Sequence, residues 1–279
     1  MAFVQLHDVG KSFGARSVLK QVNLSVAEGE FVSIVGASGA GKTTLLKIAC
    51  GLTRADAGNV SFAGQPLEGF PRRSAIVFQN YSLLPWLSAL ENVRLAIESE
   101  FADWSKTRQT EQAEKYLRMA GLGGAMNKRP GQLSGGMRQR VAIARAFAVE
   151  PRMLFLDEPF GALDALTRAT LRQELARLCA EHENNVTTLM ITNSVEEAVL
   201  LSDRVIALNR GPDAYLGPAV EILASRPRSL DSNTSDAHAN DAATLLARNQ
   251  IMEYLLASRT VEKPGVPASH FASALPVEA

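Results

Sequence analysis

The chain lacks the features that mark disulfide-rich, zinc-binding or strongly charged proteins. Only two of its 279 residues are cysteine, and Cys50 and Cys179 do not have the spacing of metal ligands. We interpret them as buried thiols in a reducing compartment. The 29 basic and 29 acidic residues cancel, so no global charge attracts nucleic acid or an anionic membrane.

Long hydrophobic runs are also missing. No window approaches the roughly 20 apolar residues that cross a bilayer, and the first residues, MAFVQLHDVGKSFG, lack the basic region and apolar run of a signal peptide. A role at a membrane therefore requires docking on another protein. With 46% hydrophobic residues, the chain can still bury the core of one large domain or two small ones.

Short β-rich runs alternate with helical patterns in much of the chain. The run from Phe31 to Val35 leads into a glycine-rich loop, and a helix is expected from Thr43 to Ala49, closed by Gly51. Strands that alternate with helices predict a parallel sheet covered on both faces. Further expected strands are FVQLHDV, VNLSV, NVSFAG, SAIVFQ, RMLFLDE, TTLMIT and RVIALN.

Two regions depart from this alternation. Residues from about 80 to 150 carry three helical patterns and predict a helical insertion. After residue 217 the composition shifts to Ser, Asn, Asp, Ala and Pro, which indicates a linker. We therefore expect one domain at 1–217 and an extension at 218–279 that holds one helix at about 241–258 and a loose tail.

The segment GASGAGKT has the pattern of a phosphate-binding loop between a strand and a helix. Glycines let consecutive N–H groups point inward, and the helix N-terminus adds positive charge. The lysine reaches the terminal phosphates and the threonine hydroxyl can bind Mg²⁺. Thr44, which follows, is either a second phosphate contact or part of the first helical turn. The loop comprises Gly36, Ala37, Ser38, Gly39, Ala40, Gly41, Lys42 and Thr43.

Two further motifs suit phosphate chemistry. Asp157 and Glu158 end an apolar strand; such a pair alone is more often a turn, but beside a phosphate loop Asp157 can hold Mg²⁺ and Glu158 can polarise the attacking water. LSGGMRQR opens a helix with Ser134 as a natural cap. Its two glycines leave bare N–H groups at a positive helix end, which also suits phosphate.

These motifs, at these separations, make residues 3–215 resemble the ATP-binding cassette subunits of ABC transporters. The resemblance implies an α/β P-loop NTPase fold with a mostly parallel sheet core, an antiparallel β subdomain and a helical insertion subdomain. It implies ATP and Mg²⁺ as cofactors, with Thr43, Gln79 and Asp157 near the metal. Phe13 in GKSFG matches the aromatic residue that stacks on adenine.

The resemblance also implies partners. Ser134, Gly135 and Gly136 match the signature that binds ATP held by a second cassette, identical or paralogous, and Asp164 matches the loop that crosses the dimer interface. A membrane permease is expected to insert its coupling helix near Gln79 to Leu87, where NYSLLPWLSALENV supplies an apolar cluster that is either core or docking surface. This implies a peripheral protein on the cytoplasmic face of the bacterial inner membrane, served indirectly by an extracytoplasmic solute-binding protein.

The branch of importers is indicated by resemblance alone. QNYSLLPWLSALENV, LDEPFGALDALTR and RNQIMEYLLAS are similar to importers of nitrate, nitrite, cyanate, bicarbonate, taurine and aliphatic sulfonates, and RGPDAYLG is most similar to the nitrate type. A taurine or sulfonate importer is the alternative cargo. A soluble ABC ATPase acting on nucleic acid or the ribosome is the alternative class, disfavoured by the balanced charge.

One position departs from the family pattern. Most members end the strand after the acidic pair in a histidine that contacts the γ-phosphate, whereas this chain has Asn193. Asn193 with Glu196, or Ser194 with Glu197, fits a capping box. Asn193 is therefore either a helix cap alone or a cap that also contacts phosphate as a degenerate catalytic position. Its amide donates a hydrogen bond but carries no charge or titrating proton.

Overall fold

A parallel sheet forms the centre of the molecule. The computed structural model describes residues 2–161, 163–181, 186–223 and 235–260, and its larger sheet has the order β10-β9-β3-β8-β7-β6. All neighbours are parallel except β10, which is antiparallel to β9. The strands span Phe31–Val35 (β3), Ser74–Val77 (β6), Met153–Asp157 (β7), Thr187–Thr192 (β8), Arg204–Leu208 (β9) and Leu216–Glu221 (β10).

The central strands are buried along their whole length. Every residue of β3, β7 and β8 is buried, which is typical of a parallel sheet covered on both faces. Helices α1 (Lys42–Ala49), α5 (Ala165–Glu181) and α6 (Val195–Leu201) follow β3, β7 and β8. The predicted alternation of strand and helix is thus confirmed.

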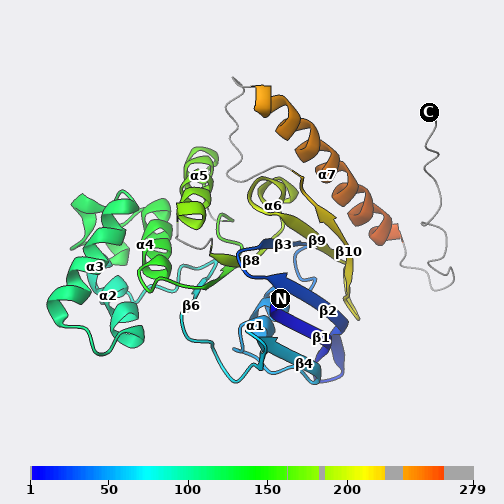
Figure 1. The fold of residues 1–279 in the computed structure, drawn as a ribbon, viewed down its shortest axis with the longest axis horizontal. Helices are drawn as coiled ribbons and strands as arrows, with labels where there is room; N and C mark the ends of the chain where they lie inside the picture. Colours follow the sequence, from blue (N-terminus) through cyan, green and yellow to red (C-terminus); the bar gives the residue numbers. More distant parts are fainter. Residues whose placement is uncertain (1, 162, 182–185, 224–234, 261–279) are drawn as a thin grey trace.

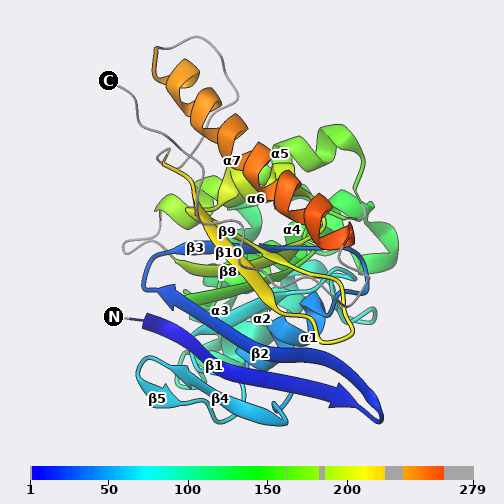
Figure 2. The same ribbon diagram turned by 90° about the vertical axis from the view of Figure 1, so that its right-hand side faces the viewer.

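The second sheet is antiparallel and lies below the first in Figures 1 and 2. Its order is β2-β1-β4-β5. In β2, buried Leu24 and Val26 alternate with exposed Ser25, as expected for a sheet with one face on the core. Its strands span Ala2–Phe13 (β1), Arg16–Ala27 (β2), Ala57–Phe62 (β4) and Gln65–Pro66 (β5).

A separate group of helices lies at the left of Figure 1, beyond β6. Ser88, Ser105 and Ser134 cap its three α-helices by accepting backbone N–H groups, and Val93, Leu117 and Phe147 are fully buried in its core. This group is the expected helical insertion. Its elements are α2 (Ala89–Glu100), α3 (Lys106–Met119), η1 (Gly123–Ala125), η2 (Pro130–Gln132) and α4 (Gly135–Phe147).

Helix α7 (Ser235–Thr260) lies across α6, β9 and β10, as both views show. Its Ala247 and Ile251 are buried in a cluster with Val199 of α6 and Val35, the last residue before the glycine loop. The C-terminal helix therefore packs behind the elements that carry the phosphate loop. Within the described residues, no helix combines the length and apolar character needed to span a membrane.

The region after residue 217 differs from the expectation in two respects. The boundary at 217/218 falls inside β10, whose pairing with β9 continues to Glu221. Pro218 is tolerated within this strand because β10 is at the edge of the sheet. The helix expected at about 241–258 begins earlier, at Ser235, and ends at Thr260; the expected linker at 224–234 and tail at 261–279 lie outside the described residues.

Gly217 provides a test of how α7 docks. A Cβ at this position would lie 2.3 Å from the Tyr254 ring, so Gly217→Ala is expected to displace α7 and cost about 1–3 kcal/mol by overpacking. Thermal unfolding should show a lower Tm, and adding Tyr254→Ala should relieve the clash. Gly124→Ala is the matched control, because nothing lies within 4 Å of a Cβ there. An equal decrease in Tm for Gly217→Ala and Gly124→Ala would contradict close packing at Gly217.

Candidate functional site

The glycine loop curls around one buried ammonium group. Lys42 is 4% exposed, and its Nζ donates to the carbonyl oxygens of Gly36 at 3.0 Å and Ala37 at 3.1 Å. A Cβ on Gly36 would lie 2.7 Å from the Leu208 carbonyl oxygen, and Gly41 has a φ of +101°. Both positions therefore require glycine, and the loop holds its shape where α1 begins.

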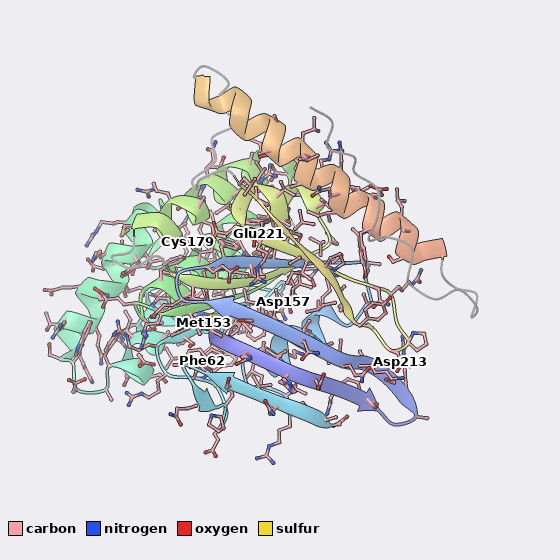
Figure 3. The ribbon with its side chains drawn as sticks, turned by 45° about the vertical axis from the view of Figure 1, so that its right-hand side comes forward. Phe62, Met153, Asp157, Cys179, Asp213 and Glu221 are labelled. Atoms are coloured by element: carbon pink, nitrogen blue, oxygen red, sulfur yellow. The ribbon has the colours of Figure 1, made fainter. Side chains whose placement is uncertain are left out.

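Asp157 is the last residue of β7 and faces this loop. Its Oδ1 accepts a hydrogen bond from Thr43 Oγ1 at 3.1 Å, and Figure 3 labels it in the central part of the molecule. Burial raises the pKa of the Asp157 carboxyl, while the Thr43 hydrogen bond lowers it. A hydroxyl and a carboxylate so close together offer two of the oxygen ligands that Mg²⁺ prefers.

Glu158 turns sharply away from the strand. Its φ is +46°, a left-handed conformation that costs about 1–3 kcal/mol for a non-glycine residue, and its N–H donates to the Ile191 carbonyl of β8 at 2.9 Å. Its Oε1 lies 3.2 Å from Lys42 Nζ, and its Oε2 accepts from Gln79 Nε2 at 3.3 Å. Three residues far apart in sequence thus meet at one carboxylate.

A cavity of about 500 Å³ opens beside these groups, within the usual size of small-molecule pockets. Phe13 forms part of its wall and is 56% exposed, as a stacking platform requires. Thr44 lies in the first turn of α1, as one interpretation expects, and also lines the cavity; its contact with phosphate stays a prediction. The other predicted residues in the lining are Ser38, Gly39, Ala40, Gly41, Lys42, Thr43, Gln79 and Glu158.

The site suits a metal that takes some of its ligands from the protein and the others from water and a bound phosphate. In the part of the chain that the structure describes, no three or more His, Cys, Asp or Glu side chains cluster to hold a metal. Mg²⁺ usually takes one or two protein ligands and completes its shell with water and phosphate oxygens. Thr43 and Asp157 fit that requirement.

Comparison with known proteins identifies the family. The family model described as ABC transporter matches residues 19–161, just over half of the chain. The chain belongs to the ABC transporter family. The expected P-loop ABC fold is confirmed by this match and by the structural neighbours described below.

Several curated ABC proteins resemble the chain over most of its length. The nitrate import ATP-binding protein NrtD of Synechococcus elongatus is 44% identical, with 84% of this chain and 86% of that protein covered. The nitrate transport protein NasD of Klebsiella oxytoca is 40% identical, with 90% and 95% covered. The bicarbonate transport ATP-binding protein CmpC of Synechocystis sp. is 46% identical over 81% of this chain. The chain spans about a third of CmpC, 34% of its length.

A solved structure shares the fold. The dimeric post-hydrolysis state of the ATP-binding cassette MJ0796, bound to ADP and Pi, aligns with a TM-score of 0.70 and 35% identity, covering 78% of this chain and 98% of that one. This ABC chain therefore has the fold of a cassette that has been observed as a dimer.

The signature residues of this ABC chain lie away from its own cavity. Ser134 caps α4 by accepting the Met137 N–H at 3.2 Å, and Ser134, Gly135 and Gly136 are absent from the cavity lining. A Cβ on Gly136 would lie 2.6 Å from the Thr167 methyl group. Glycine is needed there because α4 approaches the start of α5 closely.

Asp164 caps α5 beside this contact. Its Oδ1 accepts the Thr167 N–H at 3.0 Å, and this hydrogen bond lowers the pKa of the Asp164 carboxyl. Like the signature, Asp164 does not line the cavity. The structure thus brings Asp164 and Gly136 together through Thr167, on elements separate from the phosphate loop.

Asn193 is not the cap of α6, so the cap role that both interpretations of this residue shared is wrong, and a phosphate contact stays a prediction. Ser194 is the N-cap, since its hydroxyl accepts the Glu197 N–H at 3.2 Å. Asn193 is exposed at the end of β8, next in the sheet to β3 and β7. The N–H of Ser194 also donates to Thr192 Oγ1 at 3.0 Å, so two hydrogen bonds hold Ser194 at the start of α6, and the Asn193 side chain is not used as the cap.

The apolar cluster after Gln79 divides between core and surface. Tyr81 and Leu83 pack against the helical core and also line a groove of about 490 Å³ with Gln79, Pro130 and Arg138. Trp86 is 65% exposed. Tyr81 and Leu83 therefore belong partly to the core, as one interpretation expects, whereas docking at the exposed Trp86 stays a prediction.

Sequence reasoning missed part of the cavity wall. Its lining also includes Arg16, Ser17, Val18, Gly211 and Pro212. The loop after β9 reaches β2 because Ala214 N–H donates to the Val18 carbonyl at 3.0 Å; neighbouring Asp213, labelled in Figure 3, accepts from Lys20. The turn residues RGPD were the available signal, but no local pattern shows that this turn folds back onto β2.

Asp157 yields a stability prediction. Because burial raises its folded-state pKa, the ionised carboxylate is disfavoured in the fold relative to the unfolded chain. Asp157→Asn should therefore raise Tm at neutral pH without nucleotide. The gain should shrink as the pH falls through the raised pKa, where wild-type Asp157 becomes protonated. A pH series of thermal melts measures this, and a gain independent of pH would contradict it.

Proposed function

We propose that this chain is the ATP-hydrolysing subunit of a bacterial importer for nitrate or a related small anion. Full-length similarity to NrtD and NasD supports nitrate as cargo type, and similarity to CmpC keeps bicarbonate within the same anion class. These relatives favour such anions over taurine and sulfonates. The phosphate-directed loop and acidic pair favour a transport ATPase over an ABC protein acting on nucleic acid or the ribosome.

The observation that carries the proposal is the position of Glu158 between Lys42 and Gln79. A γ-phosphate held by the loop N–H groups and Lys42 would lie next to this carboxylate. Glu158 then orients a water molecule and accepts its proton as the water attacks phosphorus. Gln79 holds the Glu158 carboxylate and faces the same water. Mg²⁺, held by Thr43 and Asp157 with Gln79 nearby, would supply positive charge that neutralises the phosphates.

Two cassettes are needed for a complete site. Ser134, Gly135, Gly136 and Asp164 lie outside this chain's own cavity, which fits a head-to-tail dimer in which they complete the nucleotide site of a second cassette. The second cassette is identical or a paralogue. Phe13 stacks on adenine at the open side of the cavity.

The membrane connection runs through the groove at Gln79. We infer that a permease places its coupling helix against Tyr81, Leu83 and exposed Trp86, because apolar and aromatic side chains are frequent binding anchors. The chain then lies peripherally on the cytoplasmic face of the bacterial inner membrane. A solute-binding protein contacts the permease and not this chain.

Copurification from membranes tests the assembly. A tagged chain should retain a permease after detergent extraction, and the assembled transporter in vesicles should import labelled nitrate or bicarbonate with ATP. Trp86→Ala should reduce permease recovery, with Leu52→Ala, at an exposed position elsewhere, as control. Recovery of ribosomes or DNA in place of a permease would overturn the proposal, and import of taurine alone would overturn its cargo.

Glu158→Gln tests the catalytic base. An amide keeps the size of the side chain but cannot accept the proton of water, so ATP binding should persist while kcat falls by roughly a hundredfold or more. Equilibrium nucleotide binding and steady-state ATPase assays on the assembled transporter measure the two effects. Retained turnover would remove Glu158 from this role.

Substitutions of Asn193 test whether this residue, where most of the family has histidine, contacts the γ-phosphate. Charge-assisted hydrogen bonds are about twice as strong as neutral ones, so Asn193→His should raise kcat about tenfold and Asn193→Ala should lower it. The same ATPase assay on the assembled transporter measures both. If neither variant changes kcat, Asn193 makes no contact with the γ-phosphate.

A further inference from the structure

A buried carboxylate connects α6 to α5 behind the nucleotide site. Glu197 is 4% exposed, and its Oε2 accepts a hydrogen bond from Thr192 Oγ1 at 2.8 Å. Its Oε1 lies 3.9 Å from Arg168 Nε. Arg168 in turn donates from Nη2 to the Leu163 carbonyl at 3.0 Å. The contacts therefore run from the residue before Asp164 to the residue before Asn193.

Thr192 fixes the turn that presents Asn193. Its hydroxyl donates to Glu197 and accepts the N–H of Ser194 at 3.0 Å. Asn193 lies between the two residues that this second hydrogen bond joins. A shift of the Glu197 carboxylate would consequently move both ends of the turn.

At Arg168, these contacts reach the residues proposed to face the second cassette, which are Asp164 and the signature residue Gly136. Asp164 Oδ1 accepts the Thr167 N–H at 3.0 Å, next to Arg168. The Thr167 methyl group fills the space where a Cβ of Gly136 would be. The Asp164 loop, the signature helix and Arg168 thus form one packed group.

Stability alone does not require this arrangement. Glu197 is buried whereas the Arg168 side chain is 37% exposed, and desolvation of the buried carboxylate opposes its attraction to the guanidinium. The groups that face Glu197 are Thr192 from β8, Arg168 and Arg172 from α5, and Glu196 from its own helix. The contacts from Arg168 through Glu197 to Thr192 join the Asp164 loop to the turn at Asn193, so they can fix the position of one relative to the other.

We propose that Arg168, Glu197 and Thr192 form a positioning unit that fixes the Asp164 loop and Asn193 relative to each other, so that docking of the second cassette on Asp164 is transmitted to the γ-phosphate contact. The inference rests on the proposed function, which assigns roles to Asp164 and Asn193. None of the three residues lines the nucleotide cavity; they act through Asn193.

The chain offers a matched control pair. Arg172 Nη1 lies 3.6 Å from Glu196 Oε1 and joins the same two helices, but Glu196 is 69% exposed. Among the described residues, this pair makes no hydrogen bond to Leu163 or Thr192. It therefore carries the same charges between α5 and α6 and acts on Glu197 only through charge, without the hydrogen bonds that reach the two loops.

The experiment compares Thr192→Val and Glu197→Gln with Glu196→Gln in the assembled transporter. Valine keeps the shape of threonine without the hydroxyl, and glutamine keeps an acceptor without the charge. Both are expected to lower kcat about five- to tenfold, with KM for ATP unchanged because the loop from Gly36 to Thr43 is untouched. Glu196→Gln should leave both constants within twofold of wild type.

A double-mutant cycle with Asn193→Ala shows whether the effect passes through Asn193. Thr192→Val should change kcat by less than twofold once Asn193 is alanine. Additive losses, or a loss in Tm with unchanged kcat, would overturn the positioning unit while leaving ATP hydrolysis in place. Absence of ATP hydrolysis by the wild-type assembly would overturn the proposed function itself, and the inference with it.

Discussion

The contact between the end of β7 and the start of α1 organises the site. Thr43 donates to Asp157 and Lys42 pairs with Glu158, so two residues of the phosphate loop meet two adjacent carboxylates at one edge of the sheet, although β8 lies between β3 and β7. Parallel strands end at the same edge, which brings side chains from distant segments together without long loops. The buried strands β3, β7 and β8 support this edge, where Glu158 is held in a left-handed backbone conformation.

Three other parts of the fold surround this site: the helical insertion, helix α7 and the loop after β9. The helical insertion carries the signature at the cap of α4 and the groove beside Gln79. Helix α7 packs behind Val35 and α6, while the loop after β9 closes the cavity wall near Pro212. These elements pack against the loop or line the groove and cavity beside it, so each limits the space around the site.

Asn193 shows how local and tertiary information differ. By sequence, Asn193 and Ser194 are both acceptable caps. The Thr192 hydroxyl decides between them, because it binds the Ser194 N–H and the Glu197 carboxylate together. Ser194 then caps α6, and the amide of Asn193 is left at the edge where the phosphate is expected. In the proposed mechanism this uncharged donor takes the place of an imidazole, and its hydrogen bond would depend on how the turn positions it.

The sequence by itself determined the phosphate loop, the acidic strand end, the alternating strand and helix order and the helical insertion, because each is a local pattern of residue types with one favoured backbone. Only the tertiary structure decided that Gln79 meets Glu158, that RGPD folds onto β2, that β10 continues past residue 217, and that Arg168, Glu197 and Thr192 line up between two loops. These are contacts between segments distant in the chain. Sheet order and helix packing create them, and no short pattern encodes either.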